Sequence, residues 1–155
     1  RVNKVKKLCN KFNLASQIVE KNDPIIKNKE IIIINSYGNL PRFLSLSNSV
    51  FIGKSTIKKL KSVGGQSPIE AAKFGCRIYH GPFVYNFKEI YEILNKINVC
   101  YEIRNPDELA MRLSSDLRED KNNNKEFLVL IKDLERKTLD ETMNSINKFL
   151  FNENK

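Results

Sequence analysis

Residues 64–90 read GGQSPIEAAKFGCRIYHGPFVYNFKEI, and this stretch decides the fold class. In it a glycine pair precedes a helix start, where Ser67 is placed to cap the helix, Pro68 to occupy its first position and Glu70 to complete a capping box. A strand at residues 77–80 follows, and then a second loop and helix start. This order of loop, helix, strand, loop and helix is typical of an α/β unit.

The same alternation continues on both sides of this stretch. The run from Glu30 to Asn35 lacks apolar-polar alternation, which is the pattern of a strand covered on both faces of a parallel sheet. We therefore predict an α/β fold, a Rossmann-like parallel sheet with helices on both faces and a long C-terminal helix. Further strands are predicted at 17–19, 49–52 and 100–103, and helices at 2–13, 38–46, 86–97, 106–117 and from 127 onward.

The composition describes a globular chain of 155 residues, 41% of them hydrophobic. Its longest aliphatic block, Ile31 to Ile34, is far shorter than the roughly 20 residues of a membrane-spanning helix, so we predict no such span. The first residues include no initiator Met and no apolar signal core, so we expect a fragment of a longer gene product.

The cysteines and the histidine do not predict a metal centre. Cys9, Cys76 and Cys100 lie far apart among apolar residues, so we predict buried free thiols in a reducing cytosol. The single histidine, His80, cannot build a His-based metal cluster. We expect it to be satisfied by backbone at a strand end, and contact with a ligand is the alternative.

The net charge of +9 comes from 27 basic and 18 acidic side chains, a surplus that favours anionic partners such as phosphates, acidic lipid or nucleic acid. A biased genomic composition accounts for most of the lysines equally well, since charge runs are usually solvated faces. A basic nucleic-acid-binding module is therefore one interpretation. Against it, the lysines are scattered and the aromatics form no stacking motif, so we expect no nucleic acid partner.

In parallel sheets, ligands bind in the loops beyond the carboxyl ends of the strands. Three loops qualify, at residues 35–39, 53–70 and 81–87. The glycine pair of the middle loop allows close approach of a ligand, and the helix start behind it offers N–H groups to a phosphate. A purely structural interpretation stays open, in which Ser67 and Glu70 only cap each other. Tyr85 and Phe87 are likewise either base-stacking groups or core.

Three segments read together suggest a family. Residues 51–53 (FIG), 64–75 (GGQSPIEAAKFG) and 81–90 (GPFVYNFKEI) resemble the bacterial Kdo transferases, whose pattern runs FVGGS, GGHNPLE and GPHTFNFxEI. Upstream, SYGNL at 36–40 stands where that family has GDTxGEL, and the resemblance covers about Ile31 to Glu108. Kdo is 3-deoxy-D-manno-octulosonic acid.

The resemblance implies the C-terminal domain of a GT-B-fold glycosyltransferase. It implies a nucleotide-sugar-binding domain at residues 1–120 and a C-terminal helix at 121–155 that packs back on it. The first strand of this domain, ordinarily in the middle of the sheet, would end just before Arg1, so we expect it to be missing and to leave two unpaired inner edges.

The family's activity is inverting transfer of Kdo from CMP-Kdo onto lipid A precursor, in lipopolysaccharide biosynthesis at the cytoplasmic face of the inner membrane. The resemblance therefore implies CMP-Kdo as donor, no metal and no other cofactor, and an anionic membrane surface as a partner. The general base and the contacts to the lipid acceptor belong to the family's N-terminal domain, so we expect the isolated chain to be inactive.

The residues that match the family's CMP site are carried over as predictions. Glu70 corresponds to a carboxylate that binds the ribose hydroxyls, and Asn86 belongs to an Asn-Phe pair that the family has. The predicted site comprises Tyr37, Gly38, Asn39, Gly64, Gly65, Gln66, Ser67, Pro68, Ile69, Glu70 and Asn86.

Several positions depart from the family pattern and indicate a diverged transferase. Gln66 and Ser67 replace its His-Asn pair, and Lys54 replaces its second glycine. Asn39 stands for an acidic residue, and residues 83–84, Phe-Val, stand for His-Thr. The alternative enzyme is another nucleotide-sugar transferase of this architecture or a sugar-nucleotide epimerase.

Overall fold

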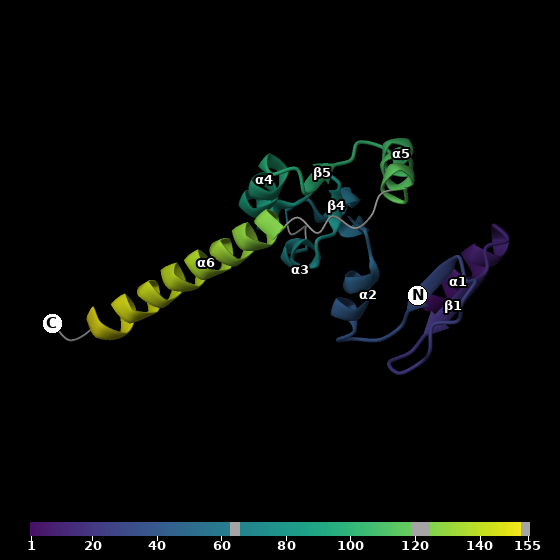
Figure 1. The fold of residues 1–155 in the computed structure, drawn as a ribbon, viewed down its shortest axis with the longest axis horizontal. Helices are drawn as coiled ribbons and strands as arrows, with labels where there is room; N and C mark the ends of the chain where they lie inside the picture. The colour runs from purple at the N-terminus through teal and green to yellow at the C-terminus, as the bar shows by residue number, and fades with distance from the viewer. Residues whose placement is uncertain (63–65, 119–124, 153–155) are drawn as a thin grey trace. The chain divides into compact units, whose positions relative to one another are not determined.

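The structure is a computed structural model that describes residues 1–62, 66–118 and 125–152 (Figure 1). It divides into two compact units, Arg1–Phe43 and Leu44–Lys155. The two units are described one at a time.

The first unit contains one helix and two parallel strands. These are α1 (Val2–Lys11), β1 (Ser16–Val19) and β2 (Ile31–Ile34), with Ser16 opposite Ile31. Asn13 ends the helical segment by adopting a φ of 55°, a left-handed conformation that Asn tolerates better than most residues. The Glu30 carboxylate accepts a hydrogen bond from Ala15 N at 2.7 Å, which joins the starts of the two strands.

The second unit is built on a parallel sheet of order β3-β4-β5, formed by Ser49–Ile52, Arg77–His80 and Cys100–Glu102. Short 3₁₀ turns follow β3 and β4 at η1 (Gly53–Thr56), η2 (Lys58–Leu60) and η3 (Tyr85–Phe87). The helices are α2 (Leu40–Leu46, which begins in the first unit), α3 (Ile69–Lys73), α4 (Lys88–Lys96), α5 (Pro106–Asp116) and α6 (Lys125–Asn152).

The core of the second unit lies where α3 and α4 pack against the sheet. Ala72, Ile78, Leu94 and Cys100 are fully buried there, and Ile131 of α6 joins the same cluster. Beyond Ile131 the structure describes six large apolar side chains of α6 that are exposed, namely Leu139, Met143, Ile146, Phe149, Leu150 and Phe151. The predicted boundary near residue 120 falls among residues 119–124, outside the described residues, and stays a prediction.

The predicted fold class is confirmed, since every described strand pairing is parallel and helices alternate with strands. Within the described ranges β1 and β2 form one parallel sheet and β3–β5 another, and the expectation of a missing strand stays a prediction. All three cysteines are buried and free, as predicted. In the part of the chain that the structure describes, no helix is both long and apolar enough to cross a membrane.

A buried carboxylate ties α5 to the sheet. Asp116, only 4% exposed, accepts hydrogen bonds from the Ser49 hydroxyl, from the Arg77 guanidinium and from the Tyr79 hydroxyl, the last at 2.8 Å. Burial raises the pKa of Asp116, but the hydrogen bonds from these three donors together outweigh burial and hold the pKa below its ordinary value of 3.8. Arg77 and Tyr79 lie on β4, so one carboxylate holds two strands and a helix together.

We predict that this carboxylate makes the fold acid-sensitive. Because the folded pKa of Asp116 is depressed, its stabilisation is fully present above pH 3.8 and is lost as the pH falls through the lower folded pKa. Asp116→Asn should lower the free energy of unfolding at pH 7 by about 2–3 kcal/mol, since it removes charge-assisted hydrogen bonds. In this variant the unfolding free energy should also decrease less as the pH falls.

The measurement is urea unfolding between pH 7 and pH 3. Asp107→Asn serves as the control, because Asp107 lies on the same helix but is exposed. It should change stability by less than about 0.5 kcal/mol. Parallel pH curves for wild type and Asp116→Asn would contradict the assignment.

Candidate functional site

The loops after β3 and β4 are fixed to each other by one buried serine. The Ser55 side chain is fully buried, donates to the Ile52 carbonyl and accepts a hydrogen bond from Gly81 N at 2.7 Å. The Ser55 carbonyl in turn accepts from Phe83 N at 2.9 Å. The carboxyl ends of these two strands, where ligands bind in parallel sheets, are therefore held in one geometry.

Gly81 is required by this close approach. A Cβ added at Gly81 would lie 2.7 Å from Thr56 Cγ2 and 2.8 Å from the Ser55 carbonyl oxygen, and the second contact is with backbone that cannot move aside cheaply. The position therefore admits only glycine, because a larger residue would overlap η1, and this requirement does not depend on a ligand.

The segment from Gln66 to Glu70 leads into α3 in the second unit. Pro68 is fully buried and anchors the segment, while Gln66, Ser67 and Glu70 are exposed and Ile69 is half-buried. The Tyr91 hydroxyl of α4 donates a 2.9 Å hydrogen bond to the Gln66 carbonyl, which fixes the start of the segment. Gly64 and Gly65, predicted as part of the same site, lie outside the described residues.

The predicted capping box at this helix is wrong, since Ser67 lies before the N-cap and Pro68 is the N-cap and not the first helical residue. The helix α3 begins at Ile69 with Pro68 as its N-cap, so Glu70 occupies the second helical position and not the third. Ser67 Oγ accepts a hydrogen bond from Ile69 N at 3.3 Å, but among the described residues the Glu70 carboxylate has no hydrogen-bond or ion-pair partner. With only five residues, α3 also has a smaller dipole than the sequence suggested.

A second helix start shows what a formed cap looks like in this chain. At α5 the residues Asn105-Pro106-Asp107-Glu108 repeat the x-Pro-x-Glu pattern. There Asn105 Oδ1 accepts from Glu108 N at 2.8 Å, and the Glu108 carboxylate accepts from Arg104 N at 3.1 Å. At the start of α3, by contrast, the Glu70 carboxylate has no such partner among the described residues, so it stays available to a ligand.

The residues around Asn86 divide between surface and core. Asn86 is exposed on η3, as is Tyr85 at 68%, while Phe87 is half-buried and packs against the core cluster. Of the two aromatics that were candidates for stacking on a base, Phe87 is therefore a core residue and only Tyr85 is exposed.

The predicted site residues of the first unit lie in the loop after β2. Tyr37 is 99% exposed, and Gly38 takes a φ of 81°, which glycine adopts without strain and which delays the start of α2 to Leu40. The Asn39 side-chain amide donates to the Lys21 carbonyl and to Ser36 Oγ, both at 3.1 Å. Asn39 is thus a structural residue of this loop, and Tyr37 is its free side chain.

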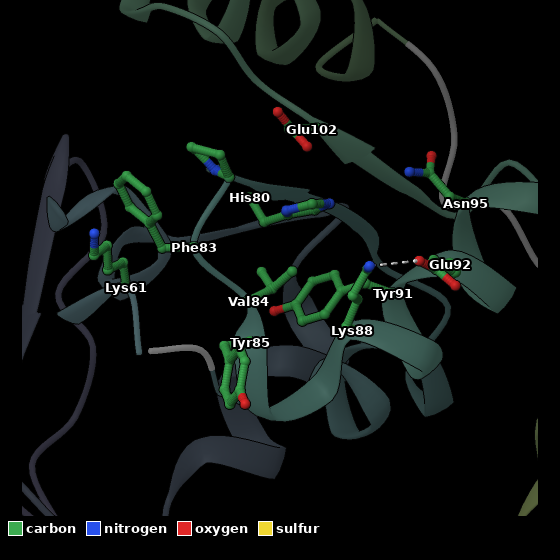
Figure 2. A pocket seen from close by; sticks show the side chains of 11 residues that line it. Lys61, His80, Phe83, Val84, Tyr85, Lys88, Tyr91, Glu92, Asn95 and Glu102 are labelled. Carbon is green, nitrogen blue, oxygen red and sulfur yellow. Dashed lines mark ion pairs between the residues drawn. The ribbon is translucent and has the colours of Figure 1, made fainter. Parts of the chain in front are cut away.

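His80 lies on the wall of a pocket that sequence reasoning missed (Figure 2). Its Nδ1–H donates to the Gly81 carbonyl at 2.7 Å, and its ring packs on Tyr91 with the centroids 4.4 Å apart. Burial lowers the pKa of His80 more than this hydrogen bond and Glu102 raise it, so the imidazole is neutral. The expected backbone contact is present for one nitrogen only, because Nε2 is buried and has no partner among the described residues.

The pocket has a volume of about 300 Å³, and none of the predicted site residues that the structure describes lines it. Its walls come from Lys61 just after η2, from the end of β4 and the loop that follows it, from α4 and from the end of β5. Lys88 and Glu92 on the α4 wall form an ion pair with a 3.8 Å separation, and both side chains are mostly exposed. In residues 1–62, 66–118 and 125–152, no cluster of three or more His, Cys, Asp or Glu is placed to hold a metal ion.

The chain was compared with known proteins. No family model matches it. The 3-deoxy-D-manno-octulosonic acid transferase of Rickettsia conorii is 30% identical over 157 residues, and that of Rickettsia prowazekii is 26% identical over 155 residues. Each match covers 97% of this chain but 32% of the relative, so the chain spans about a third of the length of these proteins.

A solved structure has the same fold. The C-terminal CMP-Kdo binding domain of WaaA from Acinetobacter baumannii superposes with a TM-score of 0.67 at 21% identity, over 84% of this chain and 65% of that one. Together with the curated relatives, this confirms the resemblance to Kdo transferases that the motifs predict.

We predict that Gly81→Ala destabilises the fold by about 2–3 kcal/mol, because the added methyl overlaps backbone at Ser55. Chemical unfolding measures the change. Gly53→Ala is the matched control, since a Cβ there meets only Phe51 Cε1 at 3.8 Å, an ordinary contact. Equal stabilities of the two variants would show that the Ser55–Gly81 junction is looser than the structure indicates.

Proposed function

We propose that this chain is the CMP-Kdo-binding part of an inverting glycosyltransferase that transfers Kdo from CMP-Kdo to lipid A precursor. The observation that carries the proposal is the exposed Glu70 carboxylate, which has no partner among the described residues although it stands at a helix start where acids usually cap. The similarity to Kdo transferases over 97% of the chain supports the same assignment.

Glu70 is proposed to bind the ribose of CMP. An ionised carboxylate accepts hydrogen bonds from two neighbouring hydroxyls, and such charge-assisted bonds are stronger than neutral ones. Pro68 and the Tyr91–Gln66 hydrogen bond hold the segment that carries Glu70, so little conformational freedom is lost when the nucleotide binds.

The other contacts follow from the resemblance and stay predictions. In this proposal the exposed Ser67 and Gln66 would contact the phosphate, and Asn86 would contact the donor. Tyr37 is the candidate from the loop after β2. Asn39 already donates to Lys21 and Ser36 within its own loop, which leaves its side-chain oxygen for a ligand.

The proposed reaction also needs a general base, which the resemblance assigns to the family's N-terminal domain. In the resemblance, a carboxylate of the N-terminal domain acts as general base on the acceptor hydroxyl, and the nucleotide site stabilises the departing CMP phosphate. The residues of this chain would hold the leaving group in position and would carry no proton. No metal is required in this scheme.

The lysine-rich segment from Lys54 to Lys61 is proposed to face an anionic membrane that holds the lipid acceptor, and the interdomain cleft is the alternative. Lys54, Lys58, Lys59 and Lys61 are all exposed, and Ile57 among them is 46% exposed. Cationic side chains around an exposed aliphatic group suit the headgroup region of an acidic bilayer.

We predict that Glu70→Gln weakens CMP binding about tenfold or more and changes the unfolding free energy by less than about 0.5 kcal/mol, because the carboxylate has no structural partner. Calorimetric titration with CMP and thermal unfolding of the full-length protein separate the two effects. Glu89→Gln is the control, an acid in the first turn of α4.

Two results would count against the nucleotide assignment. Unchanged CMP affinity with a large loss of stability would make Glu70 a structural residue. Tighter binding of UDP than of CMP would favour a different nucleotide-sugar enzyme.

We also predict that replacing Lys54, Lys58, Lys59 and Lys61 by Gln lowers binding to vesicles of acidic phospholipid about tenfold or more at low salt, since each lysine near such a surface contributes about 1 kcal/mol. The difference should shrink as salt rises. Flotation with vesicles measures it, and the control replaces four exposed lysines of the first unit, Lys4, Lys7, Lys11 and Lys29. If both variants lose vesicle binding equally, the effect depends on net charge and not on the position of these lysines.

A further inference from the structure

One hydrogen bond joins the start of the 66–70 segment to another element of the second unit. The Tyr91 hydroxyl of α4 donates to the Gln66 carbonyl at 2.9 Å. In the described part of the chain, Gln66 and Ser67 have no other hydrogen bond that leaves the segment, since the bond from Ile69 N to Ser67 Oγ lies within it. The direction of the Gln66 carbonyl therefore depends on Tyr91.

Tyr91 is held firmly enough to set that direction. It is 2% exposed and belongs to the core cluster, and its ring packs on His80. Figure 2 shows the two rings beside each other, with the hydroxyl at the end of Tyr91 that is far from α4. Burial raises the pKa of Tyr91, so the hydroxyl stays protonated and acts as a donor. A phenylalanine would fill the same space without burying a polar group, so packing alone does not account for the hydroxyl.

The bond from Tyr91 also orients the next amide. The Gln66 carbonyl and the Ser67 N–H belong to one planar trans peptide group, so they point in opposite directions. Because the carbonyl is directed at the Tyr91 hydroxyl, the Ser67 N–H points away from it. This N–H donates to no acceptor among the described residues, and Pro68, the next residue, has no N–H of its own. The Ser67 N–H is thus an oriented donor beside the exposed Glu70.

We propose that Tyr91 is a positioning residue of the nucleotide site, and that its hydroxyl orients the Gln66–Ser67 peptide so that the Ser67 N–H meets the phosphate of CMP. The inference rests on the proposed function and adds to it a residue of the core that touches no ligand. Tyr91 fixes this peptide before the nucleotide binds, so the entropy of ordering it is not lost on binding.

The test is Tyr91→Phe in the full-length protein, with CMP and cytidine as the two probes. Cytidine has the base and the ribose of CMP but no phosphate, and calorimetric displacement of CMP measures its affinity. The variant should bind CMP about fivefold more weakly or worse, because the peptide is no longer oriented in advance, and should bind cytidine as the wild type does. Only the hydroxyl is removed, so the ring keeps its packing on His80 and the melting temperature should show a folded variant.

Tyr101→Phe is the matched control. The Tyr101 hydroxyl also donates to a backbone carbonyl, that of Asn98 at 2.6 Å, but it lies on β5 and outside the proposed nucleotide contacts. Both probes should bind this variant as they bind the wild type. Glu70→Gln is the comparison for the ribose, and it should weaken CMP and cytidine alike because both contain the ribose hydroxyls.

Two results overturn the positioning role of Tyr91. An unchanged CMP affinity in Tyr91→Phe makes the hydroxyl a purely structural group, and an equal loss for CMP and cytidine shows an effect that is not specific to phosphate. Either result leaves the nucleotide assignment standing if Glu70→Gln still weakens CMP binding. A wild-type protein that does not bind CMP overturns the proposed function, and this inference with it.

Discussion

The contact between Ser55 and Gly81 is the constraint on which the candidate site depends. One fully buried hydroxyl uses both its donor and its acceptor capacity to join the ends of β3 and β4. Buried polar groups are rarely left unpaired, and here the pairing determines where two loops emerge from the sheet. Gly81 permits the two loops to approach each other because it has no Cβ. Phe83 N adds a second hydrogen bond between them, to the Ser55 carbonyl. The ligand loops are thus positioned by backbone contacts and do not rely on side chains that a ligand would need.

With the loops fixed in this way, the side chains without partners stand out. The second unit satisfies most of its buried polar groups, as at Asp116, which accepts from three donors. Among the buried polar side-chain atoms that the structure describes in this unit, His80 Nε2 lacks a partner. The exposed carboxylates of Glu70 and Glu102 also have no hydrogen-bond or ion-pair partner among the described residues. Exposed acceptors that the described residues leave unpaired are suited to a ligand rich in hydroxyl groups, and a nucleotide sugar is such a ligand.

Much of the fold could be predicted from the sequence, because periodicity and glycine positions are local signals. The strand at residues 77–80 was predicted with the bounds it has. The predicted cap at Ser67 was wrong, although the same x-Pro-x-Glu pattern forms a cap at Asn105, because local sequence does not distinguish the two helix starts. The Asp116 cluster could not be predicted, because its partners lie 37 to 67 residues away in the chain. The buried and unpaired Nε2 of His80 could not be predicted for a related reason, because its burial depends on tertiary packing.

The distribution of tyrosines allows intrinsic tyrosine fluorescence to report on this chain. The sequence has five tyrosines and no tryptophan, so tyrosine emission is not masked by energy transfer to an indole. Tyr79 and Tyr91 are 2% exposed, whereas Tyr37 is 99% and Tyr85 68% exposed, each on a loop that follows a strand. Solvent quenchers therefore reach the loop tyrosines and not the core ones. Quenching of emission distinguishes occupancy of the loops from unfolding of the core without any added label.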